Sequence, residues 1–165
     1  TTVALYFHQE RLYIGHVGDS RGYLCLPHRI WQITHDHSLV QEKLRAGIIT
    51  REQIKTDKMK HVLTRSVGVE SNIKVDIYDL ETHTGDVFVI CSDGLHGLVE
   101  DKVIAGVIQH FIFDEPLISK QREQAESQAS DFAQENIENA VKQLINFANE
   151  NGGDDNVTAI IVANC

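Results

Sequence analysis

The sequence has few of the residues that build disulfide frameworks or zinc sites. Among its 165 residues are three cysteines, Cys25, Cys91 and Cys165, and they form no C-x-x-C pair. An odd number of cysteines argues against a disulfide framework, and the nine histidines show no H-E-x-x-H or Cys/His ligand spacing. We therefore expect a reducing, cytoplasmic setting and no zinc site.

Long apolar runs and an excess of positive charge are missing as well. The longest apolar runs, residues 87–91 and 159–163, are far shorter than the roughly 20 residues of a membrane-spanning helix. With 15 Lys and Arg against 24 Asp and Glu, the net charge is −9, which repels a phosphate backbone. We expect no membrane span, no signal peptide and no nucleic-acid partner. A hydrophobic fraction of 42% excludes a disordered chain.

The apolar patterns that are present predict a mixed protein. Period-two or continuous apolar runs predict strands at residues 2–8, 12–17, 22–26, 30–33, 73–78, 87–91 and 157–163. Helical spacing and capping signals predict helices at residues 38–47, 50–53, 98–111 and 137–148. Because the connections are mostly local and hairpin-like, antiparallel pairing is favoured, and the predicted fold class is α+β, a layered sandwich in one domain over residues 1–165.

Three aspartates stand at the ends of predicted strands. Asp19 and Asp93 each follow a strand, and Asp155 precedes the last one. If the last strand is antiparallel to the others, the three carboxylates cluster, and hard oxygen ligands select Mg²⁺ or Mn²⁺. Gly94 allows a tight turn beside Asp93 that would bring a carboxylate or a backbone carbonyl onto the ion, so the predicted metal site comprises Asp19, Asp93, Gly94 and Asp155. Each aspartate alone is also explained as an ordinary turn residue.

Four segments together carry a resemblance to a known family. They are Gly18-Asp19-Ser20-Arg21, Leu63-Thr64-Arg65-Ser66-Val67-Gly68, Ile90-Cys91-Ser92-Asp93-Gly94-Leu95 and Gly153-Asp154-Asp155-Asn156-Val157-Thr158. In sequence and order they resemble the conserved blocks of the bacterial metal-dependent protein phosphatase 2C (PPM) family. The resemblance implies a four-layer α-β-β-α sandwich of two antiparallel sheets flanked by helices. It also implies hydrolysis of phosphoserine and phosphothreonine by water activated at two Mn²⁺ or Mg²⁺ ions, with a possible third.

The resemblance also implies roles for particular residues. Asp93 and Asp155 would be ligands of the metal pair, with Gly94 beside them, and Asp19 with Asp93 would border the third metal position. Residues 36–72 correspond to a flap that shapes substrate access, whereas residues 114–133 match least well and read as an insertion or an exposed helix. The pair His35 and His37 is interpreted as part of a polar turn rather than as metal ligands.

The chain departs from the family in its first metal motif. The Asp-Gly-x-Gly-Gly-His block is absent, as is the upstream arginine that grips the substrate phosphate. We therefore expect the chain to lack the N-terminal part of the catalytic domain, to be nearly inactive by itself, and to self-associate through exposed sheet edges. No catalytic side chain is assigned in it, and the substrate-binding residues are left open.

Two hypotheses for function remain open at this point. The first is that the parent protein is a Mn²⁺- or Mg²⁺-dependent serine/threonine phosphatase that acts on phosphoproteins and opposes a kinase. The alternative is a pseudophosphatase that binds a phosphoprotein or a kinase without turnover. Clustered carboxylates favour the enzyme, since a scaffold has no physical need for like charges held together.

Overall fold

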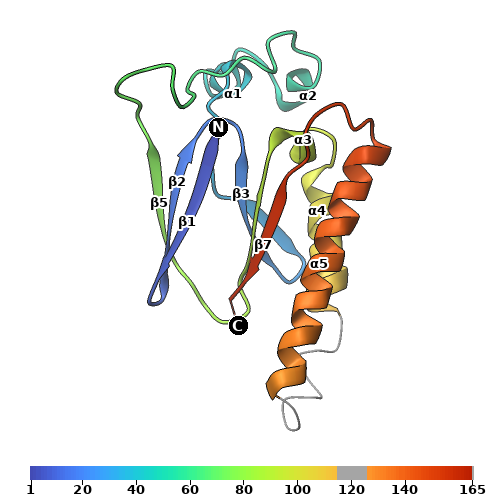
Figure 1. Ribbon diagram of the computed structural model, residues 1–165. Coiled ribbons are helices and arrows are strands. Elements are labelled where there is room, and N and C mark those ends of the chain that lie inside the picture. Colours follow the sequence, from blue (N-terminus) through green and yellow to red (C-terminus); the bar gives the residue numbers. More distant parts are fainter. Residues whose placement is uncertain (115–125, 165) are drawn as a thin grey trace. The chain divides into compact units, whose positions relative to one another are not determined.

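The structure, a computed structural model, describes the backbone of residues 1–114 and 126–164 and the side chains of residues 1–114 and 134–164. The chain forms two compact units (Figure 1). Unit 1 comprises Thr1–Gly22 and Gln32–His83, and unit 2 comprises Tyr23–Trp31 and Thr84–Cys165. Each unit is described below by itself, and the single-domain organisation stays a prediction.

Unit 1 is built on a three-stranded antiparallel sheet with the order β1-β2-β5. Strand β1 (Thr2–His8) pairs with β2 (Arg11–Val17), and Gln9 takes the turn between them with a φ of 53°. The side chains of Leu12 and Ile14 on β2 are fully buried, because β2 is the central strand and its alternate residues share one face. The predicted hairpin at residues 2–17 is therefore confirmed.

The third strand of this sheet differs from the prediction for residues 73–78. Strand β5 (Asp76–Glu81) starts three residues later and pairs antiparallel with β2. The half-buried face of β5 carries Asp76, Tyr78 and Leu80, whereas Ile77, on the opposite face, is 65% exposed. Local alternation does not determine which face becomes buried, and here the Asp76 carboxylate turns inward toward Arg65 and His37.

Unit 1 also contains two short helices, as predicted, and both precede β5 in the chain. Helix α1 (Leu39–Arg45) begins after Ser38 and is followed by Gly47, which has a φ of 69°. Helix α2 (Arg51–Ile54) has a capping box in which Gln53 Oε1 accepts a 2.7 Å hydrogen bond from the Thr50 N–H. The following segment consists of turns and bends, as expected, and a bridge between Ser38 and Leu63 ties it to the start of α1.

The second sheet has four strands in the order β4-β3-β6-β7. The strands are β3 (Arg21–Leu26), β4 (Arg29–Gln32), β6 (Val87–Cys91) and β7 (Ala159–Ala163). Strands β6 and β7 are antiparallel, with Val89 opposite Ile161. The last strand begins two residues later than predicted, and just before it the Thr158 N–H donates to the Ser92 hydroxyl instead of to a backbone carbonyl.

The helices of unit 2 are α3 (Asp93–His96), α4 (Asp101–Ile108), the π-helix η1 (Gln109–Phe113) and α5 (Glu126–Glu150). The predicted helix at 98–111 thus begins at Asp101, and its last turns widen into η1. Helix α5 contains the predicted residues 137–148, and part of the predicted insertion at 114–133 lies outside the described residues. Gly152 and Gly153, with φ of 135° and 61°, follow α5.

The core of unit 2 lies between its sheet and its helices. Strand β6 is apolar at every position, and Val87, Val89 and Cys91 are nearly inaccessible. They pack with Leu95 of α3, Ile104 of α4 and one stripe of α5, formed by Ala140, Leu144 and Ala148. Cys25 and Cys91 are buried in the core and form no disulfide, and Cys165 lies outside the described residues. Within the described part of the chain, no helix is long and apolar enough to cross a membrane.

Candidate metal centre

Asp93 lies where strand β6 turns into helix α3. Ser92 is the N-cap residue of α3, Asp93 is half-buried, and Gly94 is buried. The Gly94 N–H donates a 3.0 Å hydrogen bond to Asp93 Oδ1. The carboxylate is thus oriented by the backbone of its own turn, and a negative charge is favourable in the first turn of a helix.

Asp155 lies in the exposed turn that joins α5 to β7. The N–H of Asn156 donates a 2.7 Å hydrogen bond to Asp155 Oδ1. This arrangement repeats that of Asp93, because in both places a carboxylate accepts a hydrogen bond from the next amide. Both carboxylates therefore bond to the local backbone, which leaves the turn-residue interpretation and the metal-ligand prediction both open.

Three hydrogen bonds tie these two turns together. Ser92 Oγ donates to the Asn156 carbonyl at 3.0 Å and accepts from the Thr158 N–H at 3.1 Å. The Ser92 N–H donates to the Thr158 carbonyl at 3.1 Å. Because β6 and β7 are antiparallel, the end of one and the start of the other meet at one edge of the sheet. The segments that carry Asp93 and Asp155 are therefore side by side.

Gly94 lies directly against the turn that carries Asp155. A Cβ built on Gly94 would lie 2.4 Å from the carbonyl oxygen of Asn156 and 2.9 Å from its carbon. Only glycine allows two backbones to approach so closely. The predicted role of Gly94 as the residue that permits a tight approach at this point is consistent with this geometry.

The two carboxylates fit a hard divalent cation. Neither Asp93 nor Asp155 has an ion-pair partner among the described residues, and each accepts its single hydrogen bond through Oδ1. Oxygen donors of this kind suit Mg²⁺ or Mn²⁺ rather than zinc. Across residues 1–114 and 134–164, no group of three or more His, Cys, Asp or Glu side chains is arranged to hold a metal ion. These two carboxylates are thus part of a candidate ligand set.

Asp19 lies in unit 1, in the turn between β2 and β3. It follows Gly18, whose φ of 109° is a conformation that L side chains rarely adopt. Asp19 is half-buried, and its association with Asp93 and Asp155 stays a prediction.

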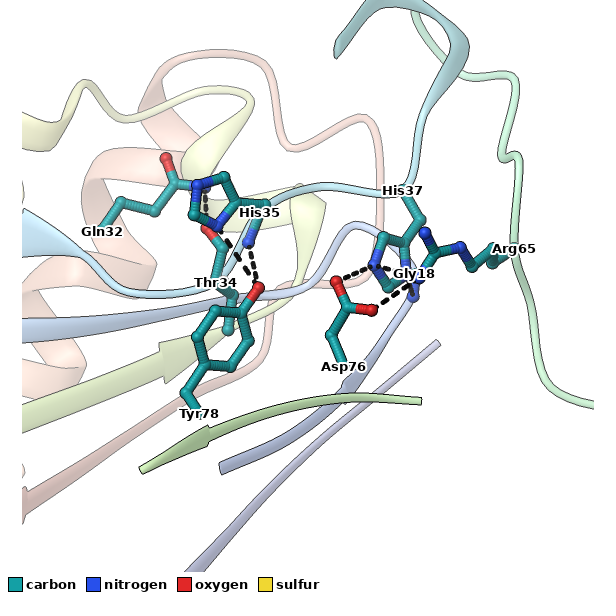
Figure 2. Close-up of polar contacts among 8 residues, drawn as sticks. All are labelled: Gly18, Gln32, Thr34, His35, His37, Arg65, Asp76 and Tyr78. Carbon is teal, nitrogen blue, oxygen red and sulfur yellow. Dashed lines mark hydrogen bonds and ion pairs between the residues drawn. The ribbon is translucent and has the colours of Figure 1, made fainter. Parts of the chain in front are cut away.

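A polar network in unit 1 was not predicted from the sequence. Figure 2 shows the Asp76 carboxylate facing both His37 and Arg65, with Gly18 next to His37. Asp76 Oδ2 lies 3.0 Å from His37 Nε2, and Arg65 Nη1 donates to Asp76 Oδ1 at 2.7 Å. Although burial raises it, the hydrogen bonds from His37 and Arg65 lower the pKa of Asp76 to about 2. The polar-turn interpretation fits the exposed His35, whereas His37 is buried.

His16 packs against this network without joining it. Its ring lies 4.6 Å from the His37 ring, centre to centre, and is fully buried. Neither ring nitrogen has a hydrogen-bond partner in the described structure. Burial lowers the pKa of His16 to about 4, and the neighbouring His37 acts in the same direction. A histidine on a strand carries no sequence signal for such a position, because its neighbours come from residues distant in the chain.

Solved structures that are similar to this chain include bacterial serine/threonine phosphatases. The structure of PstP/Ppp from Mycobacterium tuberculosis matches with a TM-score of 0.76 and 30% identity, over 98% of this chain and 58% of that chain. A second structure, described as the catalytic domain of PstP in complex with two manganese ions, matches with a TM-score of 0.69 and 30% identity, over 98% and 56%. The predicted α+β fold class is confirmed.

The chain belongs to the protein phosphatase 2C family, which matches residues 1–157. It is 34% identical over 162 residues to the serine/threonine phosphatase stp of Listeria monocytogenes, and 31% identical over 148 residues to the protein phosphatase PhpP of Streptococcus pneumoniae. These matches span 98% and 90% of this chain but 55% and 51% of the relatives. The chain thus spans about half the length of these curated relatives, and the predicted family is confirmed.

Replacing Gly94 with alanine is expected to destabilise the chain by about 1–3 kcal/mol, because the added methyl group meets backbone atoms that must shift. The matched control is Gly106→Ala in α4, where an added Cβ has no neighbour within 4 Å. Alanine in an exposed helix interior is expected to stabilise by roughly 0.5–1 kcal/mol. Urea unfolding of both variants checks the pair. Equal midpoints would show that the two turns do not depend on this close approach.

Proposed function

We propose that the protein hydrolyses phosphoserine and phosphothreonine esters in proteins, with the help of divalent metal ions. Membership of the protein phosphatase 2C family supports the reaction class. The observation that carries the proposal is the pair of turns bearing Asp93 and Asp155, which are bonded to each other and hold two carboxylates without a counter-cation in the described structure. A divalent cation bound by both carboxylates would offset their two negative charges.

The proposed ligands are Asp93 and Asp155, with Asp19 bordering a possible third ion. Two ions of Mn²⁺ or Mg²⁺, when bound, would lower the pKa of a water and offset negative charge on phosphoryl oxygens. The residues of this chain do the positioning. The N–H groups of Gly94 and Asn156 orient the two carboxylates, and Ser92 fixes the distance between their turns. We assign no protein nucleophile, since an activated water makes one unnecessary.

The proposed substrates are phosphorylated proteins, and the protein would thus oppose a serine/threonine kinase. We propose a cytoplasmic location, which is supported by the absence of a disulfide at the buried Cys25 and Cys91, because reduced cysteines are typical of that compartment. Self-association of the chain is also proposed. Light scattering over a concentration series should show a rising mass, and one constant monomer mass would contradict it.

The test uses protein expressed from the complete reading frame and a phosphothreonine peptide. We expect release of inorganic phosphate with Mn²⁺ or Mg²⁺, loss of release in EDTA, and recovery when metal is restored in excess. A protein that binds the phosphopeptide tightly in metal but releases no phosphate would contradict the proposal and favour the non-catalytic alternative.

A further inference from the structure

His37 connects its own segment of unit 1 to three others, which carry Gly18, Thr64 with Arg65, and Asp76. Its N–H donates to the Gly18 carbonyl at 2.8 Å, and its own carbonyl accepts from the Thr64 N–H at 2.8 Å. Its ring contacts the Gly18 amide on one side and Asp76 with Arg65 on the other (Figure 2). The side chain is 2% exposed, so these contacts are shielded from water.

The hydrogen bonds assign the proton of the His37 ring. The Gly18 N–H donates to Nδ1 at 3.1 Å, so Nδ1 is an acceptor and the ring proton lies on Nε2. The Nε2–H then donates to Asp76 Oδ2 at 3.0 Å, and Arg65 Nη1 donates to the other oxygen of the same carboxylate. Arg65 Nη1 also lies 3.1 Å from Nε2, but a protonated Nε2 cannot accept from it, so its hydrogen bond goes to Asp76. Asp76 and Arg65 therefore hold the tautomer in which Nδ1 can accept.

His16 limits the orientation of the His37 ring. The two rings are 4.6 Å apart with planes at 33°, and His16 offers no hydrogen bond that could compete for Nδ1 or Nε2. The His37 ring is thus packed on one face and hydrogen-bonded at both nitrogens. Such a ring has one orientation available to it, which is the property of residues that orient the ligands of a metal.

We propose that His37 is a positioning residue that holds the turn Gly18-Asp19 and the segment Thr64-Arg65 in register. Gly18 is held through both its N–H and its carbonyl, and the next residue is Asp19. The inference rests on the proposed function in one respect, namely that Asp19 faces a divalent cation. Asp76 acts through His37, as a carboxylate that orients a histidine does in many sites.

Two substitutions separate the two nitrogens of His37. In His37→Asn the amide oxygen can take the place of Nδ1 and accept from Gly18, whereas in His37→Gln the amide reaches the place of Nε2 and leaves the Gly18 N–H without an acceptor. We expect Gln to accelerate hydrogen exchange of the Gly18 amide at least about tenfold and to weaken the Mg²⁺ response of the Asp19 amide, followed by NMR, at least about tenfold. We expect Asn to keep both within about threefold of the original protein.

If His37 matters only for stability, the changes in Gly18 amide exchange and in the Mg²⁺ response of Asp19 should follow the loss of unfolding free energy in each of the two variants. That result would overturn the proposal. So would an Asp19 amide that does not respond to Mg²⁺ in the unsubstituted chain. The nitrogen shifts of His37 in the unsubstituted chain test the tautomer without any variant, and a proton found on Nδ1 would also overturn it. None of these readouts depends on turnover, so a failure of the phosphatase proposal is recognised separately, in the phosphopeptide assay.

Discussion

Replacing Asp93 or Asp155 with asparagine is expected to reduce metal-dependent phosphate release by at least about 100-fold in protein expressed from the complete reading frame. Loss of a group that only supports a metal ligand typically reduces metal affinity or activity 10- to 100-fold, so loss of a ligand charge should do no less. Folding without metal should be little affected, because neither carboxylate has an ion-pair partner among the described residues and an asparagine Oδ1 can accept the same local hydrogen bond. Phosphate release at saturating Mn²⁺ and urea unfolding in EDTA measure the two effects.

Asp154 provides the matched control for this experiment. It is exposed, stands next to Asp155 and loses the same charge in Asp154→Asn. Surface substitutions of this kind typically change free energies by about 0.5 kcal/mol, so activity should stay within about twofold of the original protein. If Asp154→Asn abolishes activity while Asp155→Asn does not, the ligand assignment is wrong by one residue.

Lowering the pH from 7 to 4 is expected to reduce the unfolding free energy by about 3 kcal/mol through His16 alone. The pKa of this group is about 4 in the folded chain and 6.5 in the unfolded chain, so between these values the unfolded chain binds a proton that the folded chain does not. Stability is therefore complete above pH 6.5 and is lost as the pH falls toward 4. His37, Asp36 and Asp76 are the titratable groups that act on His16.

His16→Phe should remove this pH dependence. It should also leave stability at pH 7 unchanged or higher, because both ring nitrogens of His16 are buried without partners. Asp76 does not interfere, since its lowered pKa contributes stability that is lost only below about 3.8, as the pH falls toward 2. An NMR titration of His16 gives an independent check, and a midpoint near 6.5 would contradict the explanation.

The parts of the fold that could be predicted are those with local signals. The hairpin at residues 2–17, the apolar strand β6 and the capping box at Thr50 each depend on neighbours within a few residues. The turns at Asp93 and Asp155 were predictable for the same reason, and antiparallel pairing was enough to bring them to one edge of the sheet. Their assignment as metal ligands came from the family resemblance and stays a prediction.

The His37 network could not be predicted because none of its contacts is local. His37, Arg65 and Asp76 are separated by 28 and 11 residues, and an irregular segment lies between them. The strand predicted at residues 73–78 starts at Asp76 instead, because local alternation does not specify the partner strand or the register. The phase of β5 follows from its register with β2, which leaves Ile77 outward and Asp76 inward.

The hydrogen bonds between Ser92 and the last turn can form only after both partners have been synthesised. The Ser92 hydroxyl bonds to the carbonyl of Asn156, 64 residues later in the chain. At translation rates of about 5–20 residues per second, roughly 3–13 s pass between the synthesis of the two partners. During that interval a nascent chain carries Asp93 at the end of a strand whose neighbour β7 has not yet been made. The pair of turns therefore assembles late, after most of the chain has been synthesised.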